Sequence, residues 1–202
     1  MIGLFMAPGL LLAFPAGFSG RFVSDRMLVG LGLAALALGG ALSALATAPV
    51  GIGAGRVLSG AGFVIAGLYF TKMVADWFEG REIATAMSIL VMSWPFGIAM
   101  GQVGHTWLTE IHGWRAAFVA SAWCALAAVA VFTLYRAPNG LPAGTGARMK
   151  GLLPHEWGLV VCAGTAWGVF NAGYVVCLSF GPSLLEAQGM GTLAAASVIS
   201  VG

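Results

Sequence analysis

Long segments without a single charged residue limit how this chain can fold. Charged residues make up 8% of its 202 residues and hydrophobic residues 59%, whereas an ordinary soluble domain carries about 25% charged residues. Nine basic and seven acidic side chains are too few to cover a soluble globule of this length. We therefore expect lipid to surround most of the surface. The charge-free runs cover residues 1–20, 27–55, 57–71, 83–109, 116–135, 157–185 and 187–202.

These runs predict six membrane spans and the beginning of a seventh. A bilayer core about 30 Å thick requires about 20 apolar residues per helix. The run from 27 to 55 is too long for one span and contains Pro49, so we divide it near 47–50. We expect an all-α polytopic membrane protein, and the short last span predicts that its helical bundle is incomplete. The expected spans lie near residues 1–20, 28–46, 50–74, 83–108, 116–135, 157–180 and 191–202.

The basic residues of the connections predict how the spans are oriented. With Arg56 set aside as lying within a span, the second, fourth and sixth connections contain only Arg115. The first, third and fifth contain Arg21, Arg26, Lys72, Arg81, Arg136, Arg148 and Lys150. Because basic connections stay on the cytoplasmic side, we expect a multi-pass protein of the cell membrane (inner or plasma membrane) with Met1 on the outer side.

A polar segment separates two regions of the chain. Residues 136–156, RAPNGLPAGTGARMKGLLPHE, combine proline, glycine and basic residues, which is typical of a linker and here predicts a cytoplasmic one. It separates the five spans of residues 1–135, an N-terminal helical bundle lacking its first helix, from the start of a C-terminal bundle at residues 157–202.

Glycines recur at spacings that favour close packing of helices. The chain has 31 glycines, and the G-x-x-x-G spacing lets helix backbones approach in lipid. The pairs with this spacing are Gly51/Gly55, Gly97/Gly101 and Gly164/Gly168. Residues 30–35 have the form G-x-G-x-x-A of a dinucleotide site, but neither the required strand before it nor the acidic residue about 20 positions later is predicted. We therefore predict helix packing and no nucleotide cofactor.

The polar residues of the spans predict no enzymatic or metal site. Cys124, Cys162 and Cys177 lie in expected spans without metal or redox spacing. His105 and His112 are poorly spaced for metal binding or catalysis. The chain also lacks a basic cluster for nucleic acid. We expect no enzyme activity, no metal, no cofactor and no nucleic-acid partner.

Arg56, which opens the segment RVLSGAG, lies inside an expected span. A charge at the bilayer centre costs about 3 kcal/mol on insertion scales, although an arginine near the end of a span can extend to the interface. Arg56 lies about six residues into its span, about 9 Å from the outer surface at 1.5 Å per residue. Two interpretations follow: a structural arginine that snorkels or binds neighbouring carbonyls, or a cation in a wet cavity that faces an anionic substrate.

Several segments resemble major facilitator superfamily transporters. Residues 55–89, GRVLSGAGFVIAGLYFTKMVADWFEGREIATAMSI, are similar to the fourth helix, its following loop and the start of the fifth helix in that family. In helix four, members of this family often have an arginine followed by a glycine four residues later, and Arg56 and Gly60 match this pair. We also expect Gly60 to be a packing glycine. GWRAAF, residues 113–118, resembles the start of the sixth helix, and residues 14–33 resemble the loop between helices two and three.

The resemblance implies a fold and a register. The family fold has two six-helix bundles with the site between them near the midplane, and this register places Met1 at helix two, Trp157 at helix seven and Gly202 within helix eight. The family's loop after helix two, G-x-x-x-D-[RK]-x-G-[RK]-[RK], is only partly matched, because an arginine stands at its acidic position. The residues expected to form the conformational loop motifs are Gly17, Arg21, Asp25, Arg26, Asp76 and Arg81.

The resemblance also implies which residues bind substrate. Helices one, four and seven commonly line the family's cavity, which nominates Arg56 on helix four and Asn171 with Tyr174 on helix seven. Asn171 and Tyr174 are three residues apart and Trp167 is four before Asn171, so these three share a face. Gln102 on helix five is a further candidate. The alternative for these side chains is hydrogen bonding and aromatic packing between helices.

We therefore predict secondary active transport of a small, anionic organic solute by alternating access. The expected partners are the lipid bilayer, the solute and, as an open alternative, a co-transported proton or cation. SWPFGIAMGQVG, residues 93–104, lacks the glycine–proline order of antiporters, which favours uniport or symport. LSFGPSLLEAQGM, residues 178–190, weakly resembles the cyanate and nitroimidazole transporter branch, and monocarboxylate-like carriers are a comparable alternative. The alternative function is that of a non-transporting membrane subunit or receptor component.

Overall fold

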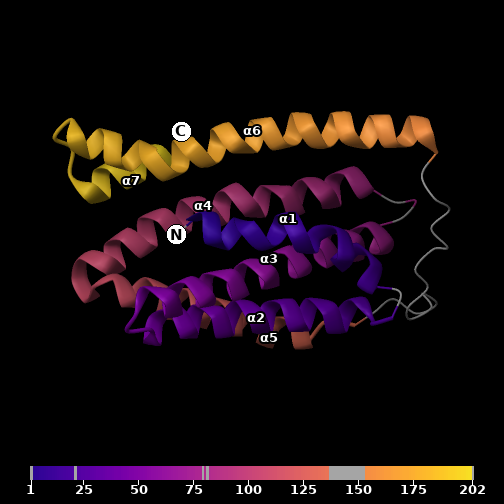
Figure 1. The fold of residues 1–202 in the computed structure, drawn as a ribbon, viewed down its shortest axis with the longest axis horizontal. Coiled ribbons are helices and arrows are strands. Elements are labelled where there is room, and N and C mark those ends of the chain that lie inside the picture. The colour runs from indigo at the N-terminus through magenta and orange to yellow at the C-terminus, as the bar shows by residue number, and fades with distance from the viewer. Residues whose placement is uncertain (1, 21, 79, 81, 137–152, 202) are drawn as a thin grey trace. The chain divides into compact units, whose positions relative to one another are not determined.

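The computed structural model describes residues 2–20, 22–78, 80, 82–136 and 153–201, and in this part of the chain every regular element is an α-helix (Figure 1). The helices are α1 (Ile2–Ser19), α2 (Asp25–Leu45), α3 (Pro49–Trp77), α4 (Ile83–His112), α5 (Trp114–Thr133), α6 (Pro154–Ala187) and α7 (Thr192–Val201). The predicted all-α architecture is confirmed.

Among the described residues, five helices are long and apolar enough to cross a membrane: α2, α3, α4, α5 and His155–Ala187 of α6. Gly3–Ser19 of α1 is a shorter apolar helix. The predicted division near residues 47–50 agrees with the structure, because α2 ends at Leu45 and α3 begins at Pro49. Proline suits the first turn of a helix, where its missing N–H leaves no hydrogen bond unmade.

Of the described helices, α6 and α4 extend farthest beyond the predicted spans. α6 begins at Pro154, and the Glu156 carboxylate accepts a 2.7 Å hydrogen bond from the Leu153 backbone N–H, which satisfies a donor at the helix start. α4 continues to His112 and ends at Gly113, whose φ of 80° is a conformation that glycine adopts without steric cost.

The described helices form two compact units, each of which is treated by itself. The N-terminal unit contains α1, α2, α3 and α5 with the two ends of α4, and the C-terminal unit contains α6, α7 and Pro95–Trp107 of α4. Residues 137–152, most of the predicted linker, lie outside the described residues. The predicted boundary within 136–156 therefore stays a prediction.

Inside the N-terminal unit, α2 packs on α3 and α5, and α1 packs on α3 (Figure 1). Four glycines form the contact between α2 and α3: Gly32 and Gly39 of α2, and Gly55 and Gly62 of α3. In each helix the two glycines are seven residues apart, so they lie on the same face, two turns from each other. A Cβ on Gly32 would lie 2.8 Å from the Gly62 carbonyl oxygen, and one on Gly39 would lie 2.5 Å from the Gly55 carbonyl oxygen. The two backbones are therefore in direct contact, as small residues allow in lipid.

The buried core of the N-terminal unit lies at the end of α2 and α3 nearest the first connection. It contains Leu28, Val29, Leu33, Ala66, Tyr69 and Met73. The Tyr69 hydroxyl donates a 2.6 Å hydrogen bond to the Ala16 carbonyl oxygen and lies 3.1 Å from the Ser19 hydroxyl. Because a buried phenol needs such a partner, Tyr69 fastens the end of α1 to α3.

The predicted packing glycines have different surroundings. Gly55 and Gly60 are in close contacts: a Cβ on Gly60 would lie 2.8 Å from the backbone carbonyl carbon of Phe5 in α1. A Cβ on Gly51 would meet only Ala46, at 3.0 Å. The described residues place no atom within 4 Å of a Cβ at Gly97, Gly101, Gly164 or Gly168. Packing by these last four residues stays a prediction.

Candidate functional site

Arg56 lies two turns inside α3, about 10 Å from the helix start at 1.5 Å per residue. Its side chain is half-buried, and its Nε atom is buried without a hydrogen-bond partner among the described residues. The guanidinium carbon lies 4.8 Å from the ring centre of Phe5 and 5.9 Å from that of Phe118. Both distances fall within cation–π range, so α1 and α5 hold the charge between two aromatic rings.

No carboxylate of the described residues forms an ion pair with Arg56. Aromatic rings compensate only part of the free energy of removing a guanidinium from water, and an unpaired buried charge is strongly destabilising. The arrangement thus leaves a cation that a bound anion or water can stabilise.

A cavity of about 230 Å³ adjoins Arg56 within the N-terminal unit. It is lined by Phe5, Leu36, Gly40, Ser43, Arg56, Ser59, Phe118, Ser121 and Ala125. At about 30 Å³ per liquid water molecule, this space has the volume of about eight water molecules, which is room for a small solute. Arg56 is the one charged side chain among the lining residues.

Three serine hydroxyls give the cavity polar walls. Ser43 donates to the Gly39 carbonyl oxygen at 2.8 Å, Ser59 to that of Leu36 at 3.5 Å, and Ser121 to that of Ala117 at 2.9 Å. The hydroxyl oxygens of Ser43 and Ser59 keep acceptor capacity. The serines therefore suit contact with water, with the guanidinium, or with a hydroxyl of a bound solute.

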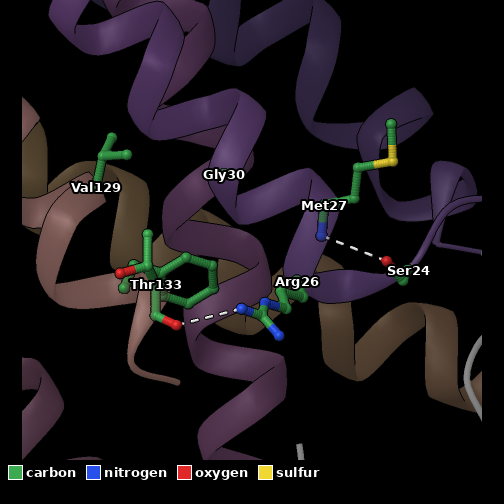
Figure 2. A pocket seen from close by; sticks show the side chains of 7 residues that line it. Ser24, Arg26, Met27, Gly30, Val129 and Thr133 are labelled. Atoms are coloured by element: carbon green, nitrogen blue, oxygen red, sulfur yellow. Dashed lines mark hydrogen bonds between the residues drawn. The ribbon is translucent and has the colours of Figure 1, made fainter. Parts of the chain in front are cut away.

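A second cavity, of about 320 Å³, lies between the start of α2 and the end of α5 (Figure 2). Its cation, Arg26, is exposed and donates from Nη2 to the Thr133 carbonyl oxygen at 3.2 Å. It is the larger cavity, but it lies at the helix ends, whereas the Arg56 cavity lies within the span and between four helices. Depth in the span is what a transport site requires, so we place the candidate site at Arg56.

Two of the predicted loop motif residues, Asp25 and Asp76, form an ion cluster with Lys72 at the start of α2 and the end of α3. Lys72 pairs with Asp25 across the two helices and with Asp76 one turn later, where Nζ and Oδ2 are 3.0 Å apart. Gly17 is exposed in α1. Arg21 and Arg81 lie outside the described residues. The cluster therefore joins two helices, with Lys72 at its centre.

The other predicted binding residues belong to the C-terminal unit. Asn171 Nδ2 donates to the Trp167 carbonyl oxygen at 2.8 Å, within one turn of α6. The Tyr174 ring stacks on that of Phe170, with 6.4 Å between ring centres. Gln102 Nε2 donates to the Leu178 carbonyl oxygen at 3.0 Å, while its Oε1 is buried without a partner among the described residues. A joint site of these residues with Arg56 stays a prediction.

The whole chain, residues 1–202, matches the model of one protein family, described as the Major Facilitator Superfamily. The chain belongs to this superfamily. This match confirms the family resemblance predicted from the sequence. Because the chain belongs to this family and has several helices that are long and apolar enough to cross a membrane, it is a multi-pass membrane protein that functions in transport. A comparison with curated proteins gives no significant match, and the likeness to the cyanate and nitroimidazole branch stays a prediction.

In this major facilitator protein, the sequence predicted Arg56 as a candidate site residue but did not predict the side chains that surround it. Ser59 could have been found, because it is three residues after Arg56 and shares its face. Phe5, Ser43 and Phe118 come from three other helices, and only tertiary packing brings them to Arg56.

Within the described residues, no group of three His, Cys, Asp or Glu side chains could hold a metal ion.

Proposed function

We propose that this major facilitator protein carries a small organic monoanion across the membrane by alternating access, with Arg56 binding the negative charge. The observation that carries the proposal is the half-buried guanidinium beside a cavity, with its Nε unpaired and no carboxylate partner among the described residues. A carboxylate can accept two parallel hydrogen bonds from a guanidinium, which compensates the charge.

The volume and the lining of the Arg56 cavity favour a small, singly charged solute. Ligand sites for drug-sized molecules span about 300–1,000 Å³, and about 230 Å³ is below that range. A second carboxylate would meet no other cation in the lining, and it would be left unpaired in a poorly solvated space. The rings of Phe5 and Phe118 suit a short apolar part of the solute.

Alternating access would proceed by movement of one helical bundle against the other around the bound solute. The close glycine contacts between α2 and α3 support movement of these helices as one body, since tightly packed interfaces deform little. We retain Gln102, Trp167, Asn171 and Tyr174 as proposed contributors from the C-terminal unit. Uniport or symport, with a proton or cation as the co-transported ion, remains the proposed mode.

The test is uptake of radiolabelled small monocarboxylates by the full-length protein in proteoliposomes. Truncating one partner of a buried charge pair costs about 2–5 kcal/mol, so Arg56→Gln should raise the uptake KM about 30-fold or more. Arg56→Lys keeps the charge but not the paired geometry and should retain part of the activity.

Arg115→Gln is the matched control, since Arg115 is also an arginine but is exposed and contacts the Ala46 carbonyl oxygen at 3.4 Å. Its uptake should equal that of the unmodified protein. Equal uptake by Arg56→Gln would remove the proposed role of Arg56. If no monocarboxylate is transported by the unmodified protein, the proposed solute class is wrong.

A further inference from the structure

The cavity between α2 and α5 has the chemistry of an amphiphile site. Its lining combines one cation, Arg26, and two exposed hydroxyls, Ser24 and Thr133, with the apolar residues Met27, Val129 and Phe132 (Figure 2). Ser24 and Arg26 lie at the start of α2, next to the connection that precedes this helix. The apolar groups continue along the two helices toward the span interior. We propose that this cavity binds an anionic phospholipid, with its phosphate on Arg26 and an acyl chain along the α2–α5 groove.

Arg26 has hydrogen-bonding capacity left for a phosphate. One guanidinium nitrogen donates to the Thr133 carbonyl oxygen, and the other N–H groups of this exposed side chain have no partner among the described residues. Ser24 Oγ accepts the Met27 backbone N–H at 3.4 Å, so its own O–H remains a donor. Guanidinium groups match phosphate oxygens through paired N–H donors.

The neighbouring carboxylate of Asp25 is held in an ion pair outside the cavity lining. Asp25 precedes Arg26 in the chain and would repel a phosphate, but its carboxylate pairs with Lys72. The cavity lining itself contains no acidic residue. A phosphate at Arg26 therefore meets one cation and no carboxylate within the cavity itself.

The cavity adjoins exposed apolar surface on both helices. A Cβ added at Gly30, on the groove floor, would have no atom within 4 Å, so the space is free of protein atoms. Apolar side chains are also exposed on both helices that form the cavity: Met27 and Leu31 are 58% and 53% exposed on α2, and Val131 is 68% exposed on α5. A cation at the end of an apolar groove fits a lipid with an anionic head group. Such lipids are concentrated in the cytoplasmic leaflet, and the start of α2 is predicted to lie on the cytoplasmic side.

The experiment titrates the purified full-length protein in neutral micelles with phosphatidylglycerol or phosphatidylcholine and counts bound lipids by native mass spectrometry. The unmodified protein should bind phosphatidylglycerol about fivefold more tightly than phosphatidylcholine, because one basic residue near the head group contributes about 1 kcal/mol. Arg26→Gln should abolish this preference, and Arg115→Gln, which removes an exposed arginine at another helix end, should retain it.

A second variant tests the groove independently of the charge. Gly30→Leu fills the open space and should weaken phosphatidylglycerol binding while leaving Arg26 intact. Gly67→Leu is its matched control, since Gly67 of α3 likewise has no atom within 4 Å of a Cβ. Inorganic phosphate and glycerol 3-phosphate, added at the lipid concentration, should not displace the lipid. Displacement by either one, or unchanged binding by Arg26→Gln or Gly30→Leu, would overturn the proposal.

Discussion

Gly39 of α2 and Gly55 of α3 face each other across the helix contact, and a Cβ on either residue would lie 2.5–2.6 Å from the carbonyl oxygen of the other. Real Cβ atoms do not approach backbone oxygens so closely. The two helices therefore have to separate if either glycine gains a side chain. The hydroxyls of Ser43 and Ser59 flank this contact and are also buried, so separation would disturb the wall of the Arg56 cavity.

We expect Gly39→Ala and Gly55→Ala to lower the free energy of unfolding by about 1–3 kcal/mol each, the usual effect of overpacking. Thermal unfolding of the purified protein in micelles measures this. Gly67→Ala is the control, because a Cβ there meets open space and alanine has the higher helix propensity. A transition temperature for Gly39→Ala equal to that of Gly67→Ala would show that the backbones are farther apart than described.

Lys72 should couple more strongly to Asp25 than to Asp76. The pair with Asp25 joins two helices, whereas the pair with Asp76 spans one turn of α3, and such single-helix pairs contribute about 0.3–0.5 kcal/mol. The side chains of Lys72 and Asp25 are 41% and 25% exposed, so we expect a coupling of about 0.5–1 kcal/mol between them.

Double-mutant cycles with Lys72→Met, Asp25→Asn and Asp76→Asn, read as free energies of unfolding, separate the two pairs. Both couplings should fall at 1 M salt, where the Debye length is about 3 Å. A zero coupling between Lys72 and Asp25 at low salt would mean that the cluster does not fasten α2 to α3.

The helices could be predicted because the bilayer imposes a simple length and charge rule, and Pro49 marks the break between α2 and α3. The finer boundaries depended on local chemistry, such as the Leu153–Glu156 hydrogen bond at the start of α6. Arg56 could be predicted because a charge in a span is rare. The rings against it could not, since Phe5 and Phe118 are 51 and 62 residues away in the sequence and reach Arg56 only through tertiary packing.

The positions of the basic residues predict that Ser24 and His112 lie on opposite sides of the membrane, with Ser24 in the cytoplasm. In a variant without Cys124, Cys162 and Cys177, a cysteine at either position reports its side through a membrane-impermeant maleimide. His112→Cys should react in intact cells, and Ser24→Cys only after permeabilisation. The opposite labelling pattern would reverse the predicted orientation, and labelling of both in intact cells would contradict an odd number of spans between them.

The contact of Gly60 with Phe5 provides a test of the cavity that leaves Arg56 unchanged. Gly60 lies one turn after Arg56 in α3, and a Cβ there would meet the backbone of Phe5. Gly60→Ala should therefore push α1 away from α3 and move the Phe5 ring from its place 4.8 Å from the Arg56 guanidinium carbon. A loss of cation–π contact at a desolvated site is worth about 2 kcal/mol, so the uptake KM should change by up to about 30-fold.

Gly53→Ala is the matched control for this last variant. It places the same methyl group on the same helix, where it would meet only the end of the Leu4 side chain, at 3.4 Å, an ordinary van der Waals distance. Its uptake kinetics should match those of the unmodified protein. Because Gly60→Ala alters the position of α1 but no polar group, a changed KM with retained folding would assign the Phe5 side of the cavity to substrate binding. Equal KM values for the two variants would show that the solute does not contact that side.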